Sequence, residues 1–208
     1  MKLVVLGATG GTGIEVVKQA LIRGHSVTAF VRSPERLASY QDSITIRKGD
    51  LLNGAELAQA LEGHDAVISA FGPRIPIAKE DSDLLQRFAA VLVKSMREAK
   101  VKRVVVESVA FLFKNSVFPP TYLLGRLLFP GVIVDASGME EALRTSVLDW
   151  TIIRPPELTD QPYTGSYRVG EGRLPAFGFK ISRANVAEFM VKAAESKESV
   201  SKVFGVSN

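Results

Sequence analysis

The chain contains no cysteine, only two histidines and a single tryptophan. The absence of cysteine excludes disulfides, thiolate zinc sites and cysteine nucleophiles, and we expect no metal site. The N-terminal segment MKLVVLGATGG reaches glycine too early for a secretory signal peptide, which needs a longer apolar run. The most apolar stretch, residues 122–134, is interrupted by Arg126 and Pro130 and is too short to span a bilayer. These absences predict a cytoplasmic protein without a membrane span.

A block of like charges is also absent, although the chain is basic overall. The 26 lysines and arginines against 22 acids give a net charge of +4, and they are spread along the sequence. Because nucleic-acid-binding proteins gather their cations in a patch or stripe, we expect no nucleic-acid partner, and a phosphorylated cofactor explains a few arginines equally well. The hydrophobic content of 46% excludes disorder. A length of 208 residues suits one domain, spanning residues 1–208.

The first half of the chain alternates between short apolar runs and helical patterns. The run at residues 2–6 ends at Gly7, and apolar residues then recur at helical spacing. We expect further strands at residues 26–31, 44–48, 66–70 and 103–106, and a long helix at residues 81–99. Apolar strands that alternate with helices indicate a parallel sheet covered on both faces. The sequence therefore predicts a doubly wound α/β fold of the Rossmann type, with three α/β/α layers.

After Ser108 the pattern becomes irregular, with three prolines within residues 111–133. We expect helices at residues 139–148 and 183–194, strands at 150–153 and 203–206, and a turn-rich region at 160–179. Ligands of α/β sheets bind beyond the C-terminal ends of the strands. The substrate pocket is therefore expected mainly in two loop regions, at residues 108–135 and 155–180, together with small C-terminal elements.

The glycine-rich string GATGGTG at residues 7–13 follows the first strand and opens the first helix. Glycine permits a tight turn and a close approach of the backbone to a diphosphate, and the helix N-terminus favours negative charge. A merely structural turn is the alternative, but the strand–turn–helix context favours a dinucleotide site. The residues expected to bind the cofactor here are Gly7, Thr9, Gly10, Gly11, Thr12 and Gly13.

The end of the second strand distinguishes NADPH from NADH. Enzymes that use NAD place an acid there for the ribose 2′-hydroxyl, whereas an arginine accommodates a 2′-phosphate. This chain has Arg32, Ser33 and Arg36 at that place, and Glu35 lies in the next helical turn, where acids are favoured. The alternative is a pair of solvated surface arginines. We predict that NADPH is preferred.

Later strand ends supply further candidates for cofactor binding. Asp50 and Leu51 follow the third strand, within reach of an adenine, although an aspartate there can also cap the following turn. The fourth strand is followed by Ala70, Phe71, Gly72 and Arg74, and the fifth ends at Ser108, whose hydroxyl would face the nicotinamide. Each has an alternative as an ordinary loop residue, and their recurrence at successive strand ends favours binding.

With these motifs the chain resembles the atypical short-chain dehydrogenase/reductases, in particular the biliverdin-IXβ reductase/flavin reductase group. The resemblance also covers VRSPERL at residues 31–37, AFLF at 110–113, RPP at 154–156 and DQPYTGSY at 160–167. It implies an NADPH-dependent reductase of flavins or linear tetrapyrroles. It further implies that Arg154 and Pro155 lie beside the nicotinamide and that Phe111 and Leu112 form a wall for a planar substrate.

Two departures from this family weaken the assignment to tetrapyrroles. Glu157 stands where the biliverdin-type members have a histidine after the double proline, and a second histidine is replaced near Ala136. His25 and His64 read as ordinary surface turns, and we assign neither any chemistry. A broader flavin or quinone reductase is therefore favoured.

The Tyr-x-x-x-Lys pair of alcohol and ketone dehydrogenases is also absent: Tyr122 has Arg126 four residues on, which cannot serve as a deprotonatable partner. A ketone needs a proton as hydride arrives, whereas a flavin ring delocalises the incoming charge and water can supply the proton. Catalysis would then be mostly juxtaposition of the two rings. Ser108 and Glu157 are the candidate catalytic residues, as groups that orient the substrate or a water molecule.

Two functions of different classes follow. The favoured one is an NADPH-dependent reductase of a small planar acceptor (a flavin, a quinone or a linear tetrapyrrole), acting as a monomer or homodimer. The alternative is a non-catalytic NAD(P)-binding regulator that senses redox state and binds a protein partner, since the fold alone does not establish catalysis. A sugar-nucleotide epimerase fits poorly, because the tyrosine–lysine pair and a sugar-binding domain are lacking. The apolar segment at residues 111–134 reads as an acceptor cover, a subunit contact or core filler.

Overall fold

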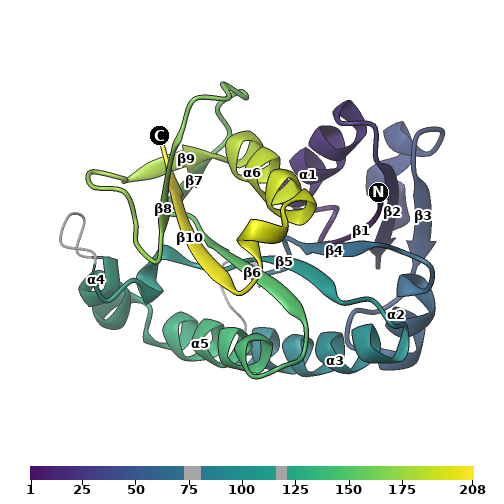
Figure 1. The fold of residues 1–208 in the computed structure, drawn as a ribbon, viewed down its shortest axis with the longest axis horizontal. Coiled ribbons are helices and arrows are strands. Elements are labelled where there is room, and N and C mark those ends of the chain that lie inside the picture. Colours follow the sequence, from purple (N-terminus) through teal and green to yellow (C-terminus); the bar gives the residue numbers. More distant parts are fainter. Residues whose placement is uncertain (73–80, 116–120) are drawn as a thin grey trace.

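The computed structural model describes residues 1–72, 81–115 and 121–208, and within them the chain forms a twisted sheet with helices on both faces (Figure 1). The eight-stranded sheet has the order β3-β2-β1-β4-β5-β6-β10-β8. Its strands are β1 (Lys2–Leu6), β2 (Ser26–Val31), β3 (Thr45–Lys48), β4 (Ala66–Ser69), β5 (Arg103–Glu107), β6 (Asp149–Arg154), β8 (Arg168–Glu171) and β10 (Lys202–Ser207). All neighbours pair in parallel except β8, which pairs antiparallel with β10. This is the doubly wound Rossmann order, so the predicted fold class is confirmed.

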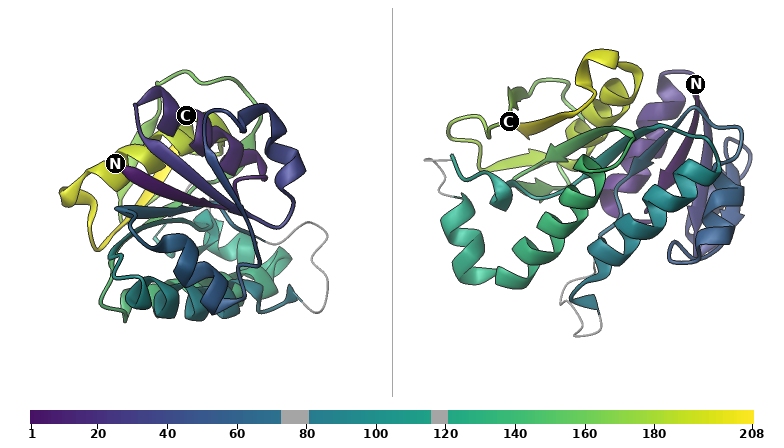
Figure 2. Two further views of the ribbon diagram at one scale, coloured as in Figure 1. Left: turned by 90° about the vertical axis from the view of Figure 1, so that its right-hand side faces the viewer. Right: turned by 60° about the horizontal axis from the view of Figure 1, so that its bottom comes forward.

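Helices cover the two faces as separate layers (Figures 1 and 2). One face carries α1 (Gly11–Ile22) and α6 (Arg183–Glu195). The other carries α2 (Gly54–Leu61), α3 (Leu84–Glu98) and α5 (Pro130–Arg144). Strand β1 shows why both faces need cover: its side chains alternate between two apolar clusters, with Leu3 and Val5 on the α1/α6 side and Val4 and Leu6 on the other.

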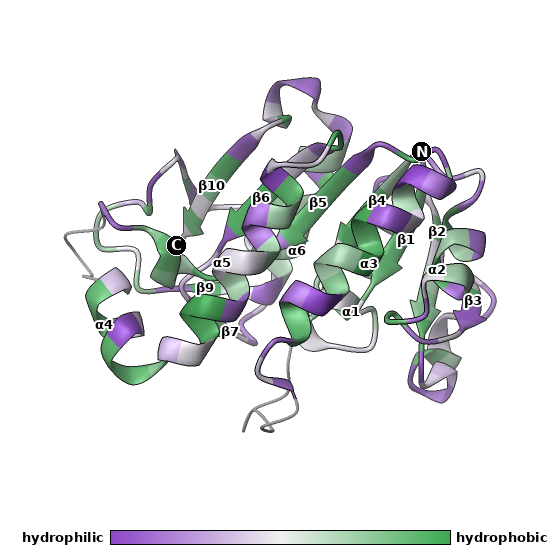
Figure 3. Ribbon diagram, turned by 90° about the horizontal axis from the view of Figure 1, so that it is seen from below, coloured by the Kyte–Doolittle hydropathy of each residue, from purple (hydrophilic) through white to green (hydrophobic). Residues whose placement is uncertain are grey.

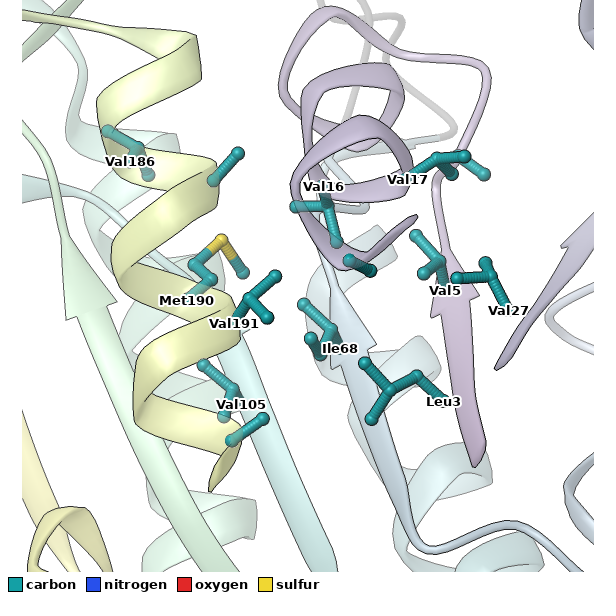
Figure 4. Packing of buried hydrophobic residues seen from close by; sticks show 14 of the residues in the cluster. Leu3, Val5, Val16, Val17, Val27, Ile68, Val105, Val186, Met190 and Val191 are labelled. Atoms are coloured by element: carbon teal, nitrogen blue, oxygen red, sulfur yellow. The ribbon is translucent and has the colours of Figure 1, made fainter. Parts of the chain in front are cut away.

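The cluster between the sheet and helices α1 and α6 fixes the start of α1, where the glycine turn lies. Val16 and Val17 of α1 and Met190 of α6 pack over Val5 and Ile68 of the sheet (Figure 4). All five of these side chains are fully buried. Burying an aliphatic side chain contributes about 1.5–3 kcal/mol, so the glycine turn is anchored on a rigid support.

The segment around residues 111–148 differs from the sequence-based expectation. The short helices η3 (Ala110–Leu112) and α4 (Thr121–Leu128) precede α5, which begins at Pro130 and ends at Arg144, whereas the sequence predicted a helix at 139–148. Proline has no N–H to lose at a first helical position and its φ is already helical, so Pro130 begins α5 instead of interrupting it. The prediction of a mainly looped segment at 108–135 is therefore wrong for its second half.

Smaller elements complete the chain. The sheet-flanking strands β7 (Glu157–Thr159) and β9 (Lys180–Ser182) form a two-stranded parallel pair. The 3₁₀ segments η1 (Pro34–Tyr40) and η4 (Lys197–Ser199) follow β2 and α6. The region predicted to be turn-rich, residues 160–179, also contains β8.

Helix α4 carries an apolar surface. Leu123, Leu127 and Leu128 of this helix and Phe129 after it are all exposed. Part of the α4 ribbon is green, the colour of hydrophobic residues, in Figure 3. None of the helices in the described ranges has both the length and the apolar character that a bilayer span requires.

Candidate functional site

A pocket of about 400 Å³ lies at the C-terminal ends of β1 to β4. This is the edge of a doubly wound sheet at which ligands bind. The residues lining it are Gly7, Thr9, Gly10, Arg32, Arg36, Asp50, Leu51, Leu52, Ala70, Phe71, Gly72, Asp81 and Leu84. Ten of the residues that the sequence predicted to bind the cofactor are therefore brought together from four different strand ends.

The glycines of the turn are required by geometry. Gly7 has φ +75°, and a Cβ there would lie 2.6 Å from the carbonyl oxygen of Ala70. A Cβ on Gly13 would lie 2.1 Å from the carbonyl oxygen of Gly7, so the helix packs directly on the turn. Gly10, which lines the pocket, donates its N–H to the carbonyl oxygen of Gly7 at 2.9 Å. This cradle leaves the first amides of α1, from Gly11 on, without intrahelical acceptors, and these fit a diphosphate.

Two arginines extend the pocket beyond β2. Arg32 follows the strand and Arg36 lies on η1, and both line the pocket with exposed side chains. Neither guanidinium has a hydrogen-bond or ion-pair partner within the described residues, so both are free to bind a phosphate. Ser33 lies between them at the start of η1, and its side chain makes no capping bond there.

The candidates after β3 and β4 line the same pocket. Oδ1 of Asp50 accepts the N–H of Leu52 at 3.0 Å, so this carboxylate caps the following turn, as the alternative interpretation held, while it faces the pocket. Phe71 packs on Phe88 of α3 with ring centroids 4.8 Å apart, which fixes the pocket wall. Arg74 lies outside the described residues.

The predicted residues of the nicotinamide side form a separate cluster around Glu140 of α5. Ser108 donates from Oγ to Oε1 of Glu140 at 2.7 Å, and Arg154 donates from Nε and Nη2 to the two carboxylate oxygens at 2.9 and 2.6 Å. Arg144 adds a contact of 3.1 Å. Within the described part of the chain, neither Ser108 nor Arg154 lines the pocket of the glycine turn. Glu140, which was not among the predicted site residues, therefore binds the Ser108 hydroxyl and two of the three Arg154 nitrogens.

The residues expected at the substrate lie near this cluster. Phe111 stacks on Phe129 with centroids 5.5 Å apart, and Leu112 lines a 250 Å³ hollow shared with Tyr122 and Arg154. The carbonyl oxygen of Pro155 accepts the N–H of Ala110 at 3.0 Å.

Two further residues of this side complete the placement. Glu157 opens β7 with an exposed side chain. The ammonium of Lys114 lies 5.8 Å from the ring centroid of Tyr122. This is a contact with the face of the ring, and it does not reproduce the Tyr-x-x-x-Lys pair.

A carboxyl group that sequence reasoning missed lies behind the glycine turn. Glu107, the last residue of β5, accepts a hydrogen bond from Oγ1 of Thr12 at 3.2 Å. Burial raises the pKa of the Glu107 carboxyl to about 7, against smaller lowering effects of the Thr12 hydroxyl and Arg183. The available signal was an acid at the end of the apolar run VVVE, directly before Ser108.

Comparisons with known proteins agree with this geometry. The profile of a family described as NAD(P)H-binding matches residues 7–197. A chloroplastic protein of Arabidopsis thaliana, described as uncharacterized, is 33% identical over 97% of this chain and 75% of its own length. The photosystem II assembly factor Ycf39 of Synechocystis is 26% identical over 99% of this chain and 62% of its own.

A solved structure shares the fold over almost the whole chain. ChuY, described as an anaerobilin reductase of Escherichia coli O157:H7, superposes with a TM-score of 0.80 at 20% identity, covering 99% of this chain and 96% of its own. At this identity the likeness concerns the fold alone.

Proposed function

Because the chain belongs to the NAD(P)H-binding family, we propose that it is an NADPH-dependent reductase that transfers hydride to a planar conjugated acceptor, a flavin in the first place. The observation that carries the proposal is one pocket in which the glycine turn meets two unpartnered arginines of the described chain, Arg32 and Arg36. The turn fits the diphosphate, and the guanidinium groups fit the 2′-phosphate that distinguishes NADPH from NADH. In this reading the chain is a member of the flavin reductase/biliverdin-IXβ reductase group.

The choice of acceptor follows from the chemistry of the nicotinamide side. Bound NADPH supplies a hydride from C4 of the nicotinamide. The Ser108 hydroxyl donates its hydrogen bond to Glu140 and is not available to protonate a substrate oxygen. A flavin ring delocalises the charge that it receives, and its proton can come from water, so a site without an acid–base pair suits it. The residues of the chain then act by holding the two rings together.

The hollow beside η3 is the candidate acceptor subsite. Leu112 and Tyr122 provide apolar and aromatic surface there. Its three cationic side chains outnumber its two carboxylates, Glu140 and Glu141, and Lys114 is the cation not paired with Glu140. These features fit a planar ring with an anionic substituent, such as the phosphate of a flavin nucleotide.

A panel of acceptors tests the proposal. Purified protein with NADPH is mixed with FMN, FAD, riboflavin, a quinone and biliverdin, and NADPH absorbance is followed. We expect steady oxidation with at least one flavin, faster with NADPH than with NADH. The Gly13→Ala protein, whose turn cannot close, should show none with any acceptor. Nucleotide binding without turnover across the panel would contradict the reductase.

The second candidate is a non-catalytic regulator that binds NAD(P) and a protein partner. Two observations favour it: the polar groups of Ser108 and Arg154 are engaged by Glu140, and α4 exposes leucines as interaction surfaces do. The relative named as an assembly factor also fits such a role. The same panel separates the two functions, since the regulator binds nucleotide tightly and turns over nothing.

A further inference from the structure

The carboxyl group of Glu107 is placed where it can sense the bound nucleotide. It ends β5, and its side chain lies on the same face as that of Val105, toward α1 and α6. There it accepts the hydroxyl of Thr12, the second residue of α1. The amides of this first helical turn are the ones that fit a diphosphate. One side chain therefore connects a titratable group to the anion site.

The surroundings leave the charge of this carboxyl only partly compensated. The polar and charged groups acting on it from the packed elements are Thr12 of α1 and Arg183 of α6. Arg183 lies against Gly11 and donates from Nη1 to Oδ1 of Asp160 at 2.5 Å, so its positive charge is shared with another acid. The neighbouring strand β6 pairs with it through the apolar Ile153.

We propose that Glu107 is a positioning residue that makes the affinity of the nucleotide site depend on pH: its neutral carboxyl holds Thr12 in the turn, and its carboxylate repels the diphosphate. In the neutral form the carbonyl oxygen accepts the Thr12 hydroxyl without adding negative charge. In the ionised form the same bond persists, and a negative charge lies behind the helix N-terminus. Low pH therefore strengthens binding, and high pH weakens it.

Both forms are present near neutral pH, because burial raises the pKa of Glu107 to about 7. Binding and protonation are reciprocal: if protonation favours the nucleotide, the nucleotide raises the pKa of Glu107 by the same free energy. The inference rests on nucleotide binding, which the family shows, and is independent of any acceptor.

Titrations of NADPH and NADH, followed by their fluorescence from about pH 5.5 to about pH 8.5, test the proposal on both sides of this pKa. For the wild type we expect the dissociation constant of NADH to rise about tenfold over this range, as a one-unit coupled pKa shift requires. Glu107→Gln keeps the acceptor for Thr12 and should bind NADH equally well at every pH. The 2′-phosphate of NADPH titrates near pH 6 whichever of the two proteins binds it. For NADPH, the ratio of the wild-type dissociation constant to that of Glu107→Gln therefore reports the contribution of Glu107 alone.

A matched control and a measurement without mutation complete the test. Glu171→Gln removes an exposed carboxylate that pairs with Lys202 on β10, and it should follow the wild type. Calorimetry of NADH binding to the wild type at about pH 7.5, in two buffers of different ionisation enthalpy, should show net proton uptake. An identical pH profile for wild type and Glu107→Gln, or binding without proton uptake, overturns the proposal. Failure of the acceptor panel contradicts only the reductase.

Discussion

Ser108, which directly follows β5, donates a hydrogen bond to Glu140 of α5, across 2.7 Å and 32 positions of sequence. The same carboxylate accepts from Nε and Nη2 of Arg154 and is only 3% exposed. Glu140 of α5 thus forms hydrogen bonds to the residues at the C-terminal ends of β5 and β6.

Replacing Glu140 should lower the free energy of unfolding. Glu140→Gln leaves the Arg154 guanidinium without a counter-charge, and breaking a buried pair costs about 3–5 kcal/mol. Urea denaturation at neutral pH should show this loss in the free energy of unfolding. The neighbouring Glu141 is exposed, and Glu141→Gln should change the stability by less than about 0.5 kcal/mol. Equal effects of the two variants would show that the Arg154 pair contributes nothing.

Cofactor preference should depend on the two arginines after β2. The Arg32→Ala/Arg36→Ala protein loses charge-assisted hydrogen bonds to the 2′-phosphate, each worth about 1.5–3 kcal/mol. We therefore expect NADPH affinity to fall roughly tenfold to a hundredfold per arginine, with little change for NADH. Fluorescence titration with both nucleotides measures this. Arg97→Ala, at the exposed end of α3, is the control; equal losses for NADPH and NADH would refute the assignment.

Two helix glycines should respond oppositely to alanine. At Gly13 the new Cβ would lie 2.1 Å from the carbonyl oxygen of Gly7, so Gly13→Ala should displace the turn and abolish nucleotide binding. At Gly131, in the first turn of α5, a Cβ meets nothing within 4 Å, and Gly131→Ala should stabilise the protein by about 0.5–1 kcal/mol. Thermal unfolding and NADPH titration of both variants test this pair. Undiminished nucleotide binding by Gly13→Ala would show that the close packing of turn and helix is not needed.

The stability of the protein should decrease as the pH rises, because of Glu107. Its folded pKa of about 7 lies above the ordinary value of 4.5, so between these pH values the folded state holds more protons than the unfolded state. The free energy of unfolding then decreases as pH rises through this window; below it Glu107 costs nothing, and above it the full penalty remains and no longer changes with pH. Glu107→Gln removes the penalty, so it should be more stable than the wild type at pH 8 by on the order of 1 kcal/mol, and similar to it at pH 4.5. Urea titrations of both proteins at pH 8 and pH 4.5 measure the free energy of unfolding. If the two proteins differed by the same free energy at both pH values, this account would be contradicted.

Much of the fold could be predicted because its signals are local. The strand β1 is apolar from Leu3 to Leu6, and the glycines that follow it are needed by its own turn, so the nucleotide motif is visible in consecutive residues. The start of α5 could not be predicted in the same way. Pro130 is typical both of loops and of a first helical position, and only the packing of α5 beside α3 decides between them.

The roles of Arg32 and Arg36 in cofactor choice stay predictions, although the structure places both at the pocket. The nicotinamide side was harder to anticipate. Ser108 and Arg154 carry groups that suit a cofactor, and nothing near them in sequence indicates that Glu140 engages both. Pairing of this kind depends on how α5 lies on the sheet.

The sequence by itself determined that this chain is a Rossmann-type NAD(P)H-binding domain, because apolar alternation and the turn at residues 7–13 act over short stretches of backbone. Only the tertiary structure decided which polar groups are free and which are bound. Thr12 meets Glu107 from 95 positions away, and burial there changes the proton affinity of the carboxyl. Charge and desolvation act through space, so residues that are distant in the chain set the chemistry of the site.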